Sequence, residues 1–149
     1  MSKVEQEVSI GRCISILYRQ SQAHFSKELQ SYKIGSGQYA VLLALKKDDG
    51  VTQERLSTLL GIDRANITRA VTKLQNEGYI LRKPDEEDKR IWRIYLTEQG
   101  RELLPILEGI LGEWSSMMVK GLSPDQINIL AKNLKTMTEN LGYEWITEE

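Results

Sequence analysis

The sequence is poor in the residues that metal sites and catalytic centres use most often. It contains one cysteine, Cys13, and one histidine, His24. A single cysteine excludes an intramolecular disulfide, and no cluster of histidines and cysteines has the spacing of a zinc site. The nucleophile, base and orienting group of most enzymes are missing as well. We therefore predict no metal, no cofactor and no enzymatic activity.

Long apolar stretches and low-complexity segments are also missing. No run of about 18 apolar residues is present to cross a bilayer, and the first ten residues alternate charged with apolar side chains, unlike a signal peptide. A composition with 40% hydrophobic and 28% charged residues is typical of a globular protein, and 149 residues favour one domain. We expect a single cytoplasmic domain over residues 1–149.

The net charge of -1 is a poor match to nucleic acid, because lysine and arginine supply most of the energy of phosphate binding. The charge is unevenly distributed, however. Residues 51–96 contain nine basic and seven acidic residues, whereas the rest of the chain contains eleven basic and fourteen acidic ones. The positive charge is therefore concentrated in the middle of the chain, where a nucleic-acid contact would have to lie.

Two helices are predicted before this region. The first covers residues 4–31 and has apolar residues on two faces, since Ile16 and Ala23 lie opposite the main stripe. Ser36 is predicted to cap a second helix, which ends at Asp48-Asp49-Gly50. The main stripe of the first helix consists of Ile10, Ile14, Leu17, Tyr18, Ser21, Phe25 and Leu29.

The middle of the chain has the element order of a winged helix-turn-helix. Thr52 is predicted to cap a short helix that turns at Gly61, and Asp63 to cap a second helix that runs to Glu77. Strands over residues 79–83 and 91–96, with a charged turn over 84–89, then form a hairpin. Two short helices followed by such a hairpin indicate a winged DNA-binding region, which we assign to residues 33–96.

Two further helices follow the hairpin. Thr97 is predicted to cap a long one that Pro105 kinks, and Ser123 opens the last one with a capping box. We predict a mainly α fold with a small β-hairpin wing, in which residues 1–32 and 97–149 form the dimerisation helices of a homodimer. Apolar residues of the long helix assigned to the dimer contact are Leu103, Leu104, Ile106, Leu107, Ile110 and Leu111.

One face of the helix after Asp63 carries the residue types that read DNA. Its core side is apolar, and between Arg64 and Asn76 there are three basic residues and no acidic one. Arginine can bond guanine, asparagine can bond adenine, and threonine can contact either bases or the thymine methyl group. The alternative is a merely solvated face. The residues predicted to contact DNA from this helix are Arg64, Ala65, Asn66, Thr68, Arg69, Thr72 and Lys73.

The hairpin turn carries four consecutive carboxylates, which repel phosphate, before it reaches Lys89 and Arg90. Asp88 and Arg90 can pair at the tip, and this pairing would hold the guanidinium ready for a narrow minor groove. Arg82, Lys83 and Arg93 add flanking positive charge. A solvated, non-functional tip is the alternative.

The hairpin and the residues after it contain a further motif, Asp88-Lys89-Arg90 followed by Leu96-Thr97 and Gly100. This motif resembles the wing signature of the MarR family of regulators, although Ile91 stands where the family usually has a small residue. The resemblance covers the whole chain. It implies a homodimeric transcription factor, usually a repressor, that binds double-stranded operator DNA and in which Asp88 and Arg90 form the wing pair.

Many relatives release DNA when a small aromatic or anionic effector binds between the dimerisation helices and the DNA-binding region. The first, second and fifth predicted helices would wall such a site here, with Tyr18, Arg19, Gln22, Tyr39 and Trp114 as candidate ligand-binding residues. Core packing or surface exposure is the alternative for each of them.

Two more assignments follow from the sequence. Cys13 is expected to be a half-buried, inert thiol, because its spacing from the nearby tyrosine differs from that of hydroperoxide sensors in the family. His24 is expected to be a surface or packing residue.

The alternative to DNA binding is a winged helix that contacts protein alone, and the arginine, threonine and asparagine face favours DNA.

Overall fold

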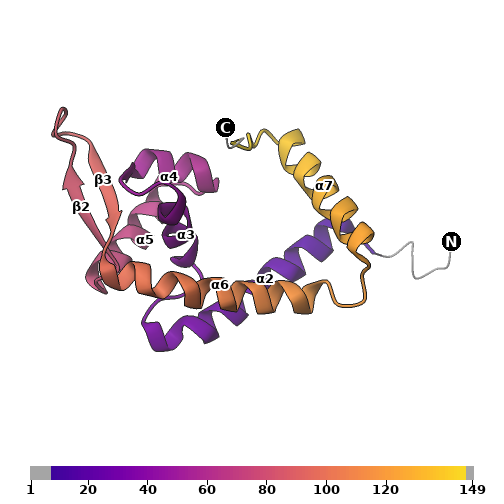
Figure 1. Ribbon diagram of the computed structural model, residues 1–149. Helices are drawn as coiled ribbons and strands as arrows, with labels where there is room; N and C mark the ends of the chain where they lie inside the picture. Colours follow the sequence, from indigo (N-terminus) through magenta and orange to yellow (C-terminus); the bar gives the residue numbers. More distant parts are fainter. Residues whose placement is uncertain (1–7, 147–149) are drawn as a thin grey trace.

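The computed structural model describes residues 8–146. Figure 1 shows α3, α4 and α5 gathered beside a projecting β-hairpin, with α6 and α2 crossing as they run toward α7. None of the helices among these residues combines the length and apolarity that a bilayer crossing requires. The elements are α2 (Ile10–Leu29), the 3-10 helix η1 (Gln30–Tyr32), α3 (Tyr39–Lys47), β1 (Val51–Thr52), α4 (Gln53–Leu60), α5 (Arg64–Asn76), β2 (Ile80–Pro84), β3 (Trp92–Leu96), α6 (Glu98–Met118) and α7 (Pro124–Asn140).

The predicted helix starts after residue 50 are confirmed. Thr52, Asp63, Thr97 and Ser123 each accept a hydrogen bond from the backbone amide three residues later, at 2.9 to 3.2 Å. Each bond satisfies one of the amides that have no partner inside the helix. Ser123 also forms the predicted capping box with Gln126. These starts depend on local bonds, which explains why the sequence alone predicts them.

The beginning of the chain differs from the prediction at both ends of the first helix. Ser9 caps α2 and the helix starts at Ile10 rather than at Val4, while residues 4–7 lie outside the described part. The predicted cap at Ser36 is wrong. The Ser26 hydroxyl donates to the Ser36 hydroxyl at 3.1 Å, and α3 starts at Tyr39 without a side-chain cap.

The sheet contains a strand that the sequence analysis did not predict. Its order is β1-β3-β2, and all pairs are antiparallel. Val51 pairs with Ile94, and Pro84 pairs with Trp92 as the last residue of β2. Proline is tolerated there because β2 is an edge strand. The hairpin is therefore anchored to the start of α4 through β1.

The core lies under the winged-helix region, residues 33–96. Leu42 of α3, Leu56 of α4, Ile67 of α5, Ile94 of β3 and Leu107 of α6 are all almost completely buried in one cluster. The long helix α6 continues through Pro105, and its first half supplies Leu103, Leu104 and Leu107 to this core. Their assignment to a dimer contact is therefore wrong, because they pack inside their own chain.

The elements outside this core leave much of their apolar surface uncovered. In α2 the buried residues are Phe25 and Leu29, at its C-terminal end. No residue of α7 is buried in the described part of the chain. The exposed large apolar residues of these helices and of α6 are Ile10, Ile14, Ile16, Leu17, Tyr18, Ile106, Met117, Met118, Ile129, Leu130 and Leu134.

Candidate nucleic-acid interface

The helix α5 separates an apolar face from a polar one. Ile67, Ala70, Val71 and Leu74 are at most 4% exposed and fix the helix on the core. The helical period then turns the opposite side toward solvent. All seven residues predicted to contact DNA from this helix are exposed: Arg64, Ala65, Asn66, Thr68, Arg69, Thr72 and Lys73. The structure thus places them on one accessible surface.

Residues at the start of α4 are bonded to this surface, and the sequence analysis missed them. The Gln53 side-chain amide donates to the Thr68 hydroxyl at 2.6 Å, and the Arg64 guanidinium pairs with Glu54 at 2.8 Å. Arg64 and Glu54 are both more than 70% exposed, so this ion pair is weak and can exchange for another partner. The capping residue Thr52 predicts where α4 begins, but it does not predict which residues of α5 contact this first turn.

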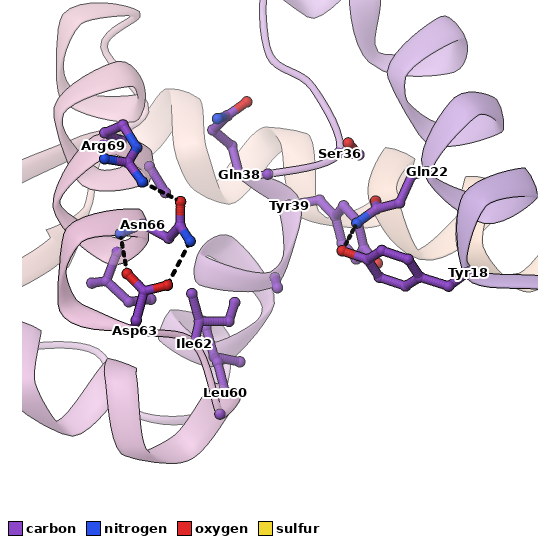
Figure 2. A pocket seen from close by; sticks show the side chains of 15 residues that line it. Tyr18, Gln22, Ser36, Gln38, Tyr39, Leu60, Ile62, Asp63, Asn66 and Arg69 are labelled. Carbon is purple, nitrogen blue, oxygen red and sulfur yellow. Dashed lines mark hydrogen bonds between the residues drawn. The ribbon is translucent and has the colours of Figure 1, made fainter. Parts of the chain in front are cut away.

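A second set of polar contacts lies along α5 itself (Figure 2). The Arg69 guanidinium donates to the Asn66 side-chain oxygen at 2.5 Å, and the Asn66 amide nitrogen donates to Asp63 at 2.6 Å. Hydrogen bonds from the Asn66 backbone and side chain lower the pKa of Asp63. Asp63 therefore remains ionised and serves both to start the helix and to orient Asn66.

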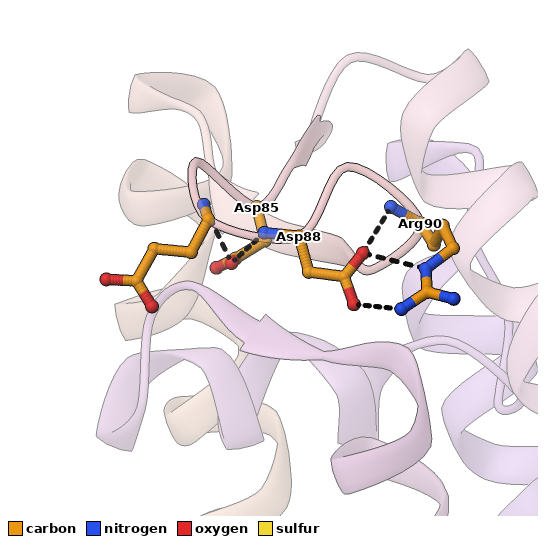
Figure 3. A network of polar contacts seen from close by, with 4 residues as sticks. Asp85, Asp88 and Arg90 are labelled. Carbon is orange, nitrogen blue, oxygen red and sulfur yellow. Dashed lines mark hydrogen bonds and ion pairs between the residues drawn. The ribbon is translucent and has the colours of Figure 1, made fainter.

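The predicted pairing at the wing tip is confirmed (Figure 3). Arg90 Nε and Nη2 each lie 3.0 Å from an Asp88 oxygen, and the Arg90 backbone amide donates to the same carboxylate at 3.1 Å. These bonds from Arg90 lower the pKa of Asp88. The Arg90 side chain is 90% exposed. The tip therefore presents an oriented guanidinium to solvent.

Asp85 organises the rest of the wing loop, a role that the sequence analysis did not assign. Its carboxylate accepts from the backbone amides of Glu87 and Asp88, at 3.2 and 3.0 Å, and from Arg93 Nε at 2.6 Å. The bond from the Arg93 side chain is the main cause of the lowered pKa of Asp85. Arg93 also donates to the Gly50 carbonyl, at 3.0 Å. The Arg93 guanidinium is thus engaged within the protein.

The two cations of β2 lie against aromatic rings. The Arg82 guanidinium is 5.1 Å from the centre of the Trp92 ring, and the Lys83 ammonium is 5.6 Å from that of Tyr95. Arg82 Nε is buried and has no hydrogen-bond partner within the described part of the chain. Such stacking holds a cation in place while leaving donors of the group available.

Two shallow clefts connect the wing to α5. One, of about 340 Å³, is lined by Arg82 and Arg90 together with Gln53 and Glu54. The other, of about 220 Å³, is lined by the same Gln53 and Glu54 together with Arg64. The start of α4 therefore joins the wing cations to the polar face of α5 in one continuous surface.

A larger cleft, of about 740 Å³, lies between α5 and α2 (Figure 2). Tyr18, Gln22 and Tyr39 line it, and so do Asn66 and Arg69 of α5. Its walls are α2, the start of α3, the turn between α4 and α5, and α5, whereas α6, which the sequence analysis expected as a wall of an effector site, supplies no residue to it. Gln22 donates to the Tyr18 hydroxyl at 2.6 Å, while the Gln22 side-chain oxygen is buried and finds no partner among residues 8–146. Burial raises the pKa of Tyr39.

The other candidate ligand residues lie away from this cleft. Arg19 donates to Ser15 at 2.5 Å on α2. The Trp114 indole donates to Ser21 at 2.7 Å and stacks on His24, with ring centres 4.4 Å apart. His24 is thus a packing residue, as expected.

Cys13 is partly buried, and this agrees with the expectation that it is half-buried. Residues 8–146 contain no group of three or more histidine, cysteine or acidic side chains that could hold a metal ion.

Comparison with known proteins gives consistent matches. The family model described as the MarR family matches residues 34–92. A MarR transcriptional regulator from Methanosarcina mazei Go1 has 40% identity and a TM-score of 0.82, covering 88% of this chain and 94% of that one. A MarR family regulator from Listeria monocytogenes, solved in complex with a 26mer DNA, has 26% identity and a TM-score of 0.85, covering 94% and 99%. The uncharacterized HTH-type regulator YybA of Bacillus subtilis is 26% identical over 91% of each chain.

Proposed function

Because the chain belongs to the MarR family of transcriptional regulators, we propose that it binds double-stranded DNA sequence-specifically, as a cytoplasmic homodimer. The observation that carries the proposal is the continuous surface formed by α5, the start of α4 and the wing tip. This surface presents Arg64 and Arg69 from α5 and Arg90 from the wing tip, and the exposed face of α5 carries no acidic residue. The DNA complex of the Listeria relative supports the same partner.

In this proposal α5 lies in the major groove and reads bases with Arg69, Asn66 and Thr72. Arg90 enters the adjacent minor groove, where the negative potential is enhanced when the groove is narrow. Arg82 and Lys83 contact phosphate. Arg64 exchanges Glu54 for DNA, which costs little because their ion pair is exposed. Arg93 supports the wing loop through Asp85 and contributes to DNA binding by shaping it.

The homodimer follows from the uncovered apolar surface of the helices outside the core. Exposed apolar residues on α2, such as Ile14 and Leu17, and on α7, such as Ile129 and Leu134, have no cover in one chain. An apolar surface of this extent marks a protein interface. We therefore assign the exposed apolar faces of α2, α7 and the end of α6 to dimerisation. Light scattering at micromolar concentration should give twice the 17.1 kDa chain mass, and a stable monomer would contradict the assignment.

We further propose that the protein is a repressor that a small aromatic anion releases from DNA. A cleft of about 740 Å³ has the size of a ligand pocket. The Gln22 side-chain oxygen accepts a hydrogen bond from the ligand, and the Arg69 guanidinium pairs with the negative charge of the ligand. Because Arg69 also reads bases, effector and operator compete for the same side chain.

A panel of aromatic carboxylates that also carry a hydrogen-bond donor, beginning with 4-hydroxybenzoate, tests the effector. Ligand should release the operator from the parent protein, and Gln22→Leu should weaken release while leaving operator affinity in the absence of ligand unchanged. Release that is equal in both proteins would contradict the assigned site.

Selection of binding sequences from random duplexes tests DNA binding against the alternative of a protein-contact module. We expect enrichment of a two-fold symmetric sequence, with affinity that falls steeply as salt rises because bound cations displace counterions. Absence of enrichment, together with weak binding to all duplexes at about 50 mM salt, would favour the alternative.

A further inference from the structure

The residues that follow α7 return to the winged-helix region. The amides of Gly142 and Tyr143 bond the carbonyls of Glu139 and Thr138, at 3.0 and 3.1 Å, and Gly142 has a φ of +92°. This turn ends α7 and redirects the chain. Figure 1 shows the C-terminal segment beside α4, far from the point where α6 enters the core. We call residues 141–146 the C-terminal strut.

Tyr143 makes the contact between the strut and α4. Its hydroxyl donates to the Leu59 carbonyl at 2.5 Å. Leu59 is in the last turn of α4, where carbonyls have no partner inside the helix, so Tyr143 satisfies an otherwise free acceptor. Its ring lies against Gly61, where an added Cβ would be 3.5 Å from the ring. Gly61, with a φ of +62°, forms the turn two residues before the cap of α5.

The strut is also braced on the α7 side. The ring of Trp145 meets that of Tyr143 edge to face, with centres 5.0 Å apart. The Trp145 indole donates to the Thr138 hydroxyl of α7 at 2.8 Å. Tyr143 is therefore held between α7 and the turn of the helix-turn-helix rather than resting on it as a loose end.

This contact gives the winged-helix region a second attachment. The first attachment is made by the half of α6 that supplies Leu103 and Leu107 to the core, and by the C-terminal end of α2, which supplies Phe25 and Leu29. These two helices also pack against each other, through Phe25 and Trp114. A region attached where these two helices meet the core retains freedom to tilt about that attachment, and a contact at a distant point restricts the tilt. The distant point here is the turn that orients α5.

We propose that the C-terminal strut fixes the orientation of the winged-helix region relative to the dimerisation helices, with Tyr143 as its positioning residue. The inference rests on the proposed DNA-binding homodimer. Two recognition helices reach successive major grooves only when they are about 34 Å apart, one turn of DNA. Fixing each winged-helix region therefore fixes the half-site spacing that the dimer accepts.

Tyr143→Phe tests this role, since it removes one hydroxyl and keeps the ring. Tyr79→Phe is the matched control, because the Tyr79 hydroxyl donates to the Tyr32 carbonyl at 2.7 Å within the core region. Affinities are measured for selected operators whose half-sites are moved apart or together by one and two base pairs. We expect Tyr143→Phe to reduce discrimination between spacings about threefold to fivefold, the effect of one hydrogen bond. Tyr79→Phe should keep the parent's discrimination.

Equal discrimination by the parent and Tyr143→Phe would overturn the proposal, and so would an equal loss in both variants, because that would show a general loss of stability. Failure of the parent to bind any duplex would instead contradict the proposed function.

A second measurement needs no DNA. Spin labels at Glu87→Cys and Lys132→Cys, in a Cys13→Ser background and diluted with unlabelled chains, report the distance between the wing and α7. We expect a broader distance distribution in Tyr143→Phe than in the parent or Tyr79→Phe. Distance distributions of equal width in all three proteins would overturn the proposed role of the C-terminal strut.

Discussion

At the wing tip, the charge of Asp88 and its positioning of Arg90 have opposite expected effects on DNA affinity. Asp88→Ala removes a negative charge near phosphate, which should strengthen DNA binding if charge alone matters. The same substitution removes both side-chain bonds that orient the Arg90 guanidinium, and a free arginine loses much side-chain entropy on binding. We expect Asp88→Ala to bind the operator more weakly than the parent.

Glu86→Ala is the matched control, since it removes an equal charge from the same loop. Glu86 is exposed, and its side chain has no hydrogen-bond or ion-pair partner among residues 8–146. We expect Glu86→Ala to strengthen binding by about twofold at low salt, an effect that screening removes at high salt. The two alanine variants should therefore shift operator affinity in opposite directions.

Arg90→Ala shows how much the Arg90 cation itself contributes to DNA affinity and to its salt dependence. Each cation that neutralises phosphate contributes about 0.9 to the slope of log affinity against log salt, so the two wings of a dimer contribute about 1.8. Between about 50 and 200 mM salt, the advantage of the parent over Arg90→Ala should shrink by about twelvefold. Fluorescence anisotropy titrations at four salt concentrations measure these slopes. If Asp88→Ala bound as tightly as Glu86→Ala, the positioning role of Asp88 would be refuted.

Three further variants test other parts of the account. Arg69→Ala should lose about 1–3 kcal/mol of discrimination between operator and scrambled duplex, whereas Arg82→Ala should weaken both duplexes alike; an equal loss in both variants would contradict the base-reading role. Gly100→Ala should lower the free energy of unfolding by about 1–3 kcal/mol or more in urea, because a Cβ there would lie 2.2 Å from the Tyr79 carbonyl oxygen, and unchanged stability would refute this packing. Because its pKa is lowered, the Asp85 carboxylate contributes to folding stability fully above pH 3.8, its unperturbed pKa, and this contribution is lost as the pH falls below that value. In thermal unfolding, Asp85→Asn should lose less stability over this acid range than the parent. An unchanged dependence of stability on pH would count against the role of Asp85 in the wing loop.

The features predicted correctly from sequence are those that depend on neighbours along the chain. Thr52, Asp63 and Thr97 cap helices through amides three residues away. The pairing of Asp88 with Arg90 spans two residues. Side chains at such short spacing have few alternative geometries, so local sequence determines them.

The features that were missed depend on distant parts of the chain. Strand β1 exists because Val51 pairs with Ile94, across the whole helix-turn-helix. Ser36 fails as a cap because its hydroxyl binds Ser26, ten residues away on α2. The walls of the large cleft likewise depend on how α2 crosses the winged-helix region. Periodicity and spacing carry no information on these contacts.

We propose that α5 and the wing together read the sequence of double-stranded DNA. The most direct test is the ratio of affinities for the selected operator and a scrambled duplex of equal length, measured by anisotropy at about 150 mM salt. We expect a ratio of at least about 10³, as for other specific DNA-binding proteins. A ratio near one, with both duplexes bound equally, would contradict the account.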